Sequence, residues 1–193
     1  MVLRLDVNDR KVMRTVGLRE ALLLGIAFIL LHLCVFNSPV MAEEGITKEH
    51  LIKTAFVYNF LKFVSWGSPV KSLTTCVEGK GSMAKALKSL EGKSVGDISI
   101  EVRWCKGVCR LERCRVIFVT SSWAGDLRKL LSRCESKGIL TISDKDRFVD
   151  EGGIIGLKKE GGRIRFEINL KAAKDAHVFI SSKLLKLARR VVR

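Results

Sequence analysis

Apolar residues in this chain switch between helical spacing and short continuous or alternating runs. Between Thr47 and Val64, five of them recur at helical spacing: Ile52, Ala55, Phe56, Phe60 and Phe63. This pattern predicts a helix over 47–64, with Thr47 as its N-cap. Leu51, Val57 and Leu61 add apolar surface on other sides, so we expect the helix to be buried on more than one side.

Strands and helices are predicted to alternate along the rest of the chain. The patterns indicate strands at 73–78, 98–102, 114–120 and 139–143, and helices at 83–90, 127–134 and from 181 or 182 to 192. Residues 154–157 and 164–168 are typical of a hairpin that turns at Gly161-Gly162. Together these elements predict an α/β fold: a three-layer sandwich whose mainly parallel sheet is flanked by helices and carries a C-terminal antiparallel hairpin edge.

Residues 1–42 are predicted to be a secretory signal peptide. Five basic residues precede a 16-residue apolar run, Ala21 to Phe36, and Val40-Met41-Ala42 supplies the small residues for cleavage after Ala42. The run is shorter than the roughly 20 residues that span a bilayer, so an uncleaved membrane anchor is the weaker alternative. Cleavage leaves one domain, residues 43–193, in an oxidising compartment.

Charge indicates what the chain binds. Lys and Arg number 35 against 20 Asp and Glu, a net charge of +15; removing the signal, with five basic and three acidic residues, leaves +13. Lys186, Arg189, Arg190 and Arg193 are predicted to share one face of the last helix. We interpret the first three as candidates for contact with an acidic partner, against the alternative of a solvated face. Aromatic residues are not interleaved with the basic ones, so no nucleic-acid partner is predicted.

Candidate catalytic chemistry is sparse. Gly79-x-Gly81-x-x-Ala84 with Glu101 has the spacing of a dinucleotide-binding turn, but Glu101 lies inside a predicted strand, which favours a plain strand-to-helix turn that needs positive φ. Asp144 and Asp146 follow a strand end, where α/β proteins often bind ligands. A polar loop is the simpler interpretation. We therefore predict no enzyme, no cofactor and no metal, and keep small-ligand binding at these aspartates and the Gly79–Gly81 turn as the alternative function.

Five cysteines remain after the predicted cleavage. Cys76 and Cys114 belong to two predicted strands that a sheet can place side by side, and a bridge between them would contribute roughly 4 kcal/mol in the chain-entropy model. Cys134 continues the apolar stripe of the helix at 127–134 and is predicted to be a buried free thiol. Cys105 and Cys109 are then left to close a small loop. A four-cysteine zinc site is the alternative, although no Cys-x-x-Cys pair is present.

Several ordered motifs resemble the YfiR-like family of periplasmic regulatory proteins. They cover about residues 47–192 and include Ala55-Phe56-Val57-Tyr58-Asn59-Phe60, Cys76-Val77-Glu78-Gly79, Gly152-Gly153-Ile154-Ile155, Arg163-Ile164-Arg165-Phe166-Glu167-Ile168-Asn169 and Ile180-Ser181-Ser182-Lys183-Leu184-Leu185. The resemblance implies a non-enzymatic periplasmic protein that represses an inner-membrane diguanylate cyclase by binding its periplasmic part, which lowers cyclic di-GMP signalling. The sequence leaves open whether the chain is also a homodimer.

The resemblance also bears on the cysteines. The first disulfide of the family falls by position on Cys76 and Cys114, in agreement with the strand argument. A second cysteine pair found in some members would fall near residues 149–156, where this chain has no cysteine. Cys105, Cys109 and Cys134 are departures from the family pattern.

Overall fold

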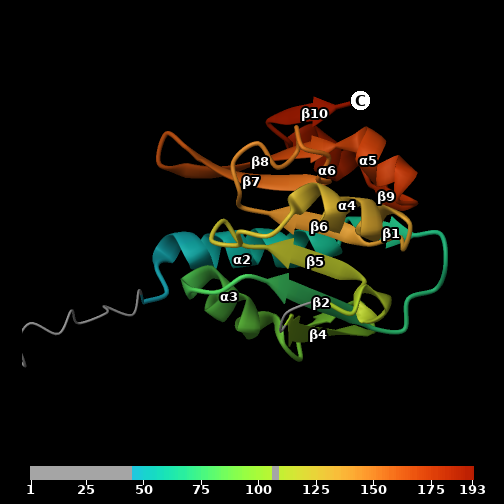
Figure 1. The fold of residues 1–193 in the computed structure, drawn as a ribbon, viewed down its shortest axis with the longest axis horizontal. Helices are drawn as coiled ribbons and strands as arrows, with labels where there is room; N and C mark the ends of the chain where they lie inside the picture. The colour runs from blue at the N-terminus through green and yellow to red at the C-terminus, as the bar shows by residue number, and fades with distance from the viewer. Residues whose placement is uncertain (1–44, 106–108) are drawn as a thin grey trace, which may run out of the picture. The chain divides into compact units, whose positions relative to one another are not determined.

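The computed structural model describes residues 45–105 and 109–193, so the predicted signal peptide lies outside the described residues. Their main feature is a sheet with the strand order β10-β8-β7-β6-β5-β2-β4-β3 (Figure 1). β1 and β9 form a separate two-stranded sheet. The strands of both sheets are β1 (Val64–Trp66), β2 (Leu73–Glu78), β3 (Ser94–Val95), β4 (Ile98–Trp104), β5 (Val116–Val119), β6 (Leu140–Ser143), β7 (Ile155–Glu160), β8 (Arg163–Asn169), β9 (Val178–Ile180) and β10 (Arg190–Val192). The helices are α2 (Lys48–Leu61), α3 (Ser82–Leu87), α4 (Leu127–Glu135), α5 (Leu170–Asp175) and α6 (Ser182–Leu187), with 3₁₀ turns η1 (Lys88–Leu90) and η2 (Leu111–Arg113).

The sheet is mainly parallel, as predicted. Strands β4, β2, β5, β6 and β7 run in one direction, and β8 returns antiparallel to β7. Gly161 and Gly162 have φ values of 54° and 73° between these two strands, the conformation that a two-residue hairpin turn requires. The hairpin therefore lies near one edge of the sheet, and β10 is the outermost strand, parallel to β8.

Helices cover both faces of the sheet and confirm the three layers. Alternate residues of β5 show the division: Val116 and Phe118 belong to the core cluster beneath α2 and α3, whereas Ile117 and Val119 belong to the cluster beneath α4. Figure 1 shows α4 on the opposite side of the sheet from α2. All four residues of β5 are buried, which is what the continuous apolar run predicted.

The first helix differs from the prediction in its end and in its buried face. Thr47 caps α2 as predicted, but the helix ends at Leu61, and residues 64–66 form β1, which pairs with β9. The buried side contains Val57 and Leu61 beside Phe60, whereas Ile52 is 38% exposed. Because apolar residues surround this helix, their spacing alone did not select the face that the sheet covers.

The C-terminal helix is shorter than predicted. It ends at Leu187, and Arg190–Val192 form β10 against β8. The prediction of one helical face carrying Lys186, Arg189 and Arg190 is therefore wrong. Two adjacent valines, Val191 and Val192, favour a strand, and the hydrogen-bonding edge of β8 gives that strand a partner. No helix in the described part of the chain is long and apolar enough to cross a membrane.

Candidate functional site

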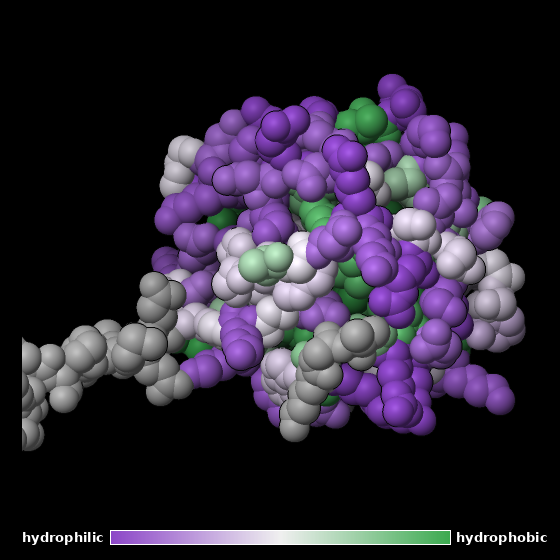
Figure 2. Space-filling model, viewed as in Figure 1, coloured by the Kyte–Doolittle hydropathy of each residue, from purple (hydrophilic) through white to green (hydrophobic). Residues whose placement is uncertain are grey.

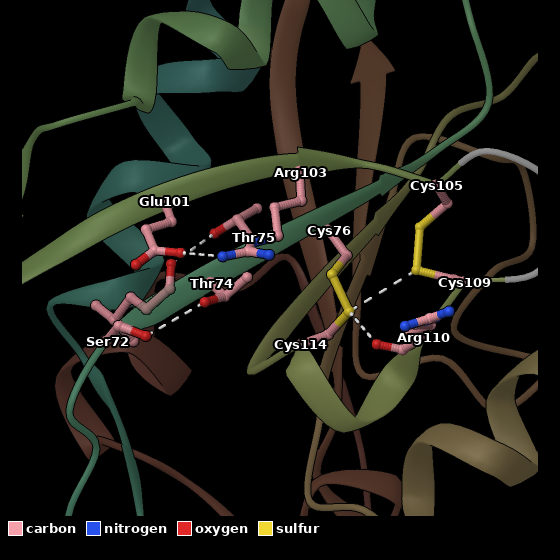
Figure 3. Close-up of a disulfide and its surroundings, with 11 residues drawn as sticks. Ser72, Thr74, Thr75, Cys76, Glu101, Arg103, Cys105, Cys109, Arg110 and Cys114 are labelled. Carbon is pink, nitrogen blue, oxygen red and sulfur yellow. Dashed lines mark hydrogen bonds and ion pairs between the residues drawn. A yellow bond between two sulfur atoms is a disulfide. The ribbon is translucent and has the colours of Figure 1, made fainter.

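Two disulfides lie side by side at the α4 face of the sheet (Figure 3). Cys76 is in β2 and Cys114 lies two residues before β5, its parallel neighbour, with 5.7 Å between their Cα atoms. Cys105 directly follows β4 and bonds Cys109, with a Cα separation of 4.8 Å. Both pairings predicted from the sequence are therefore present. The first bridge ties two neighbouring strands of the sheet, and the second closes a loop of four residues' separation.

The four sulfurs form one compact cluster. Cys109 Sγ lies 3.7 Å from Cys114 Sγ, and the Sγ atoms of Cys76, Cys105 and Cys109 all lie within 4.8 Å of one another. Cys105 is half-buried, while the other three are buried. Zinc requires thiolates, and in this structure the sulfurs are bonded in two pairs. The zinc alternative would therefore require both disulfides to be reduced first.

Cys134, the fifth cysteine of the described residues, is free, in agreement with the prediction. It is fully buried on α4 within the same core cluster as both disulfides. Burial raises the pKa of its thiol to about 12, with the nearby positive charge of Arg133 opposing the shift. The protonated thiol is a poor nucleophile, so Cys134 acts as a small apolar side chain in this core.

Asp144 follows β6 and is enclosed by an ion-pair network. One oxygen accepts a hydrogen bond from Lys53 Nζ at 2.9 Å, and the other accepts one from the Ser121 backbone N–H at 2.7 Å. Lys53 also contacts Glu49 at 2.8 Å, and Glu49 contacts Lys159 at 2.8 Å. Asp144 therefore joins α2 to the carboxyl ends of β5 and β6.

Titration in this network follows from its ion pairs. The hydrogen bond from Lys159, and then that from Lys53, lowers the pKa of Glu49 to about 2. Burial works to lower the pKa of Lys53, but its bonds to Glu49 and Asp144 outweigh burial and raise it. Both groups are therefore charged at neutral pH, and Asp144 is engaged by the protein's own lysine. Asp146 lies apart from it, exposed beside Arg190 in a small cleft of about 50 Å³.

The glycine-rich turn after β2 is closed by protein rather than open to a ligand. A Cβ on Gly79, whose φ is +106°, would lie 1.9 Å from Thr120 Oγ1. Ser122 Oγ donates a hydrogen bond to the Lys80 carbonyl at 2.9 Å. The loop that follows β5 thus sits against this turn. The geometry supports the plain-turn interpretation, in which the glycine permits positive φ and close approach.

The C-terminal arginines stabilise the edge of the sheet. Arg190 pairs with Glu167 at 2.6 Å and with Asp150 at 2.8 Å, and Arg189 pairs with Glu167 at 2.9 Å. Glu167 is only 8% exposed, and the hydrogen bond from Arg190 lowers its pKa. Lys186 instead lies exposed on α6. Of the three basic candidates, only Lys186 is outside this internal network.

Sequence reasoning missed Lys53 and Glu167, the two buried charges that organise these networks. A lysine four residues after Glu49 on a helix surrounded by apolar residues was a signal for a buried ion pair. Glu167 within an apolar strand was a second such signal. Neither signal identifies the partner, because Asp144, Arg189 and Arg190 lie 22 to 91 residues away in the sequence.

The layers, the strand order and the bridge between β2 and β5 define a disulfide-stapled α/β domain. The sequence profile of the YfiR/HmsC-like family matches residues 50–189. The chain belongs to this family, whose members are periplasmic regulators rather than enzymes. Both disulfides agree with folding outside the reducing cytosol.

Comparison with known structures supports the fold alone. The chain is similar to the conserved domain protein from Vibrio cholerae O1 biovar El Tor strain N16961, with a TM-score of 0.50 and 12% identity. That match covers 74% of this chain and 60% of the Vibrio chain. The ABC domain in complex with L-Trp from Streptococcus pneumonia aligns with a TM-score of 0.46 and 11% identity over 74% of this chain and 60% of its own. No curated protein matches the sequence.

Proposed function

We propose that this protein is exported by its signal peptide to the periplasm and represses an inner-membrane signalling partner there. The partner is a diguanylate cyclase, so binding lowers cyclic di-GMP signalling. The observation that carries the proposal is the family match over residues 50–189, because the family consists of periplasmic regulators of such cyclases. Repression requires the protein to bind the inactive state of its partner more tightly than the active state.

The surface of the domain supports a polar contact with the partner. On the face that Figure 2 shows, hydrophilic residues cover most of the surface and the apolar areas are small and separate. The net charge of +13 after removal of the predicted signal favours an acidic partner surface. Such complementarity mainly accelerates association and selects the partner.

Within this surface, α6 offers the contact residues that best fit the proposal. Lys186 is exposed, and the neighbouring Leu187 is 70% exposed. An exposed leucine beside a lysine supplies apolar area together with a charge for an acidic partner. Arg189 and Arg190 would support partner binding only indirectly, by holding the sheet edge in place, because the carboxylates that they pair with lie within the domain.

A pull-down with the periplasmic parts of membrane cyclases and kinases from the same genome tests the proposal. The oxidised protein is expected to retain one cyclase fragment, and Lys186→Glu is expected to weaken that retention. Lys129→Glu on the exposed side of α4 is the matched charge reversal and is expected to leave binding unchanged. Failure to retain any cyclase fragment, whether the protein is oxidised or reduced, would contradict the proposal.

An apolar cleft favours the alternative of small-ligand binding, at a different place from the aspartate loop. The cleft has a volume of about 370 Å³ and is lined by apolar side chains that include Leu61, Trp66, Val70 and Ile98. This volume lies within the range of small-molecule sites. A thermal-shift screen with nucleotides, amino acids and small apolar compounds tests it, and a Trp66→Ala variant that still gives the wild-type shift would exclude this cleft.

A further inference from the structure

The two disulfides are close enough to exchange partners with each other. Cys109 Sγ and Cys114 Sγ, which belong to different bridges, are 3.7 Å apart, near the van der Waals contact of two sulfurs. Cys76 Sγ lies within 4.8 Å of both Cys105 Sγ and Cys109 Sγ. Figure 3 shows the two bridges adjacent, with a dashed line that joins the sulfurs of Cys109 and Cys114. Each sulfur of one bridge therefore has a potential new partner in the other.

We infer that these four cysteines form a thiol–disulfide exchange site that binds an anionic low-molecular-weight thiol, which catalyses the exchange. The inference rests on the sulfur geometry and does not depend on the identity of the regulated partner. Exchange interconverts two pairings: Cys76–Cys114 with Cys105–Cys109, as in this structure, and Cys109–Cys114 with Cys76–Cys105.

Accessibility determines where the external thiol attacks. Cys105 is half-buried, whereas Cys76, Cys109 and Cys114 are 3%, 5% and 7% exposed. A thiolate therefore reaches Cys105 Sγ first. Its attack forms a mixed disulfide on Cys105, breaks the bond to Cys109, and leaves the electron pair on Cys109 Sγ as a thiolate.

The next two steps return the external thiol. The Cys109 thiolate attacks Cys114 Sγ, forms Cys109–Cys114, and expels Cys76 as a thiolate. Cys76 then attacks Cys105 Sγ, forms Cys76–Cys105, and releases the external thiolate. Two disulfides are present before and after, so the sequence involves no net oxidation or reduction and the thiol acts as a catalyst.

The second pairing fits the strand order. The Cys105 backbone N–H donates to the Val77 carbonyl at 3.0 Å, so Cys76 and Cys105 lie on neighbouring, hydrogen-bonded segments. Exchange would replace the disulfide between β2 and the β5 side by one between β2 and the end of β4. In the starting state β2 is bonded covalently to the β5 side, and in the product it is bonded to the β4 side. The domain would thus have two disulfide-bonded states of equal oxidation level.

The surroundings of the sulfurs select the charge of the thiol. A cleft of about 230 Å³ opens beside them, lined by Cys76, Cys105 and Cys109 and by Arg103, Arg110 and Arg113. Glu101 pairs with Arg103 at 2.9 Å (Figure 3), whereas no carboxylate among residues 45–105 and 109–193 pairs with Arg110 or Arg113. Two exposed guanidinium groups attract a thiol that carries carboxylates.

Disulfide mapping tests the inference directly, because trypsin places every cysteine after residue 42 on a separate peptide, such as Ser72–Lys80 for Cys76. The oxidised protein is incubated without oxygen with about 0.1 equivalent of reduced glutathione, quenched by alkylation and digested. We expect the Cys109–Cys114 and Cys76–Cys105 peptides to appear while the total number of thiols stays constant. Retention of the original pairs alone, with excess glutathione only reducing them, would overturn the inference.

Variants separate exchange from its alternatives. Cys105→Ser leaves a thiol on Cys109, and we expect the Cys109–Cys114 peptide and an alkylatable Cys76 without any added thiol. Cys134→Ser removes the one free thiol among residues 45–105 and 109–193 and is expected to exchange like the wild type. Loss of exchange would show that Cys134 drives it. The double variant Arg110→Ser, Arg113→Ser is expected to slow the exchange catalysed by glutathione about tenfold relative to the exchange catalysed by cationic cysteamine. An equal effect on both rates would contradict an anion-selective site.

Discussion

The two halves of the sheet are held by different forces. On the β2–β5 side, two disulfides fix neighbouring strands and the loop after β4. On the β7–β8–β10 side, ion pairs from Arg189, Arg190 and Lys159 hold the edge and the helix above it. We therefore expect the disulfide-bonded half to be the more sensitive to thiols and the ion-paired half to be the more sensitive to acid. The predictions below test whether these two sensitivities can be separated.

The largest effect is expected from removing the staple between β2 and β5. Replacing Cys76 and Cys114 together by Ser removes the constraint on a loop of 38 residues' separation, and we expect about 4 kcal/mol less free energy of unfolding. Urea denaturation measures this loss, and repression of the cyclase is expected to weaken with it. An unchanged midpoint would show that the ion-paired half alone sustains the fold.

Removing Glu167 is expected to have the largest effect on the ion-paired half. Glu167→Gln leaves Arg189 and Arg190 without their shared, buried partner, and we expect a loss of about 2 kcal/mol. Asp150→Asn is the matched control, since Asp150 pairs with Arg190 at the exposed rim, and its change is expected to fall within error. Equal losses in both variants would contradict the central role of the buried carboxylate.

Acid is expected to weaken the ion-paired half at a defined pH. The pKa of Glu49 is about 2 in the folded state against an ordinary value of 4.5. Its ion pairs therefore stabilise the protein above pH 4.5, and this contribution, about 1 kcal/mol for a partly exposed pair, is lost as the pH falls towards 2. Denaturation curves between pH 7 and pH 2 measure it. Glu49→Gln should flatten this part of the profile, and an unflattened profile would assign the acid sensitivity to other carboxylates.

The smallest effect is expected from mild alkylation of Cys134. Because burial raises the pKa of this thiol to about 12, the native protein at pH 8 should incorporate almost no iodoacetamide at Cys134. Mass spectrometry of its tryptic peptide measures the labelling, and urea should restore full labelling. Rapid labelling of the native protein would show that the core of the disulfide-bonded half opens readily.

The two halves also differ in how far the sequence predicted them. Leu127, Leu130, Leu131 and Cys134 form a narrow apolar stripe, and all four are buried as predicted. The predicted strands placed Cys76 beside Cys114, whereas the Cys105–Cys109 bridge was one possible pairing, with a zinc site as its alternative. The ion-paired half was harder to predict, because basic residues such as Arg189 and Arg190 occur both on exposed helix faces and on edge strands. The pairing with β8, whose Glu167 binds both arginines, is what settles the strand, and it lies outside the local sequence pattern.

The pairing of β1 with β9 joins the end of the first helix to the C-terminal part of the chain. Val64 lies opposite Ile180 in that small sheet, and Phe60 of α2 packs against Phe166 at 5.0 Å between ring centroids. These contacts span more than a hundred residues of sequence, and contacts of such separation form late in folding. If the chain is exported as proposed, the opening helix could pack on α3 early but would lack β8 and β9 until the segment around residue 180 had crossed the membrane. The contacts that hold this helix against the sheet edge would therefore be among the last to form after translocation.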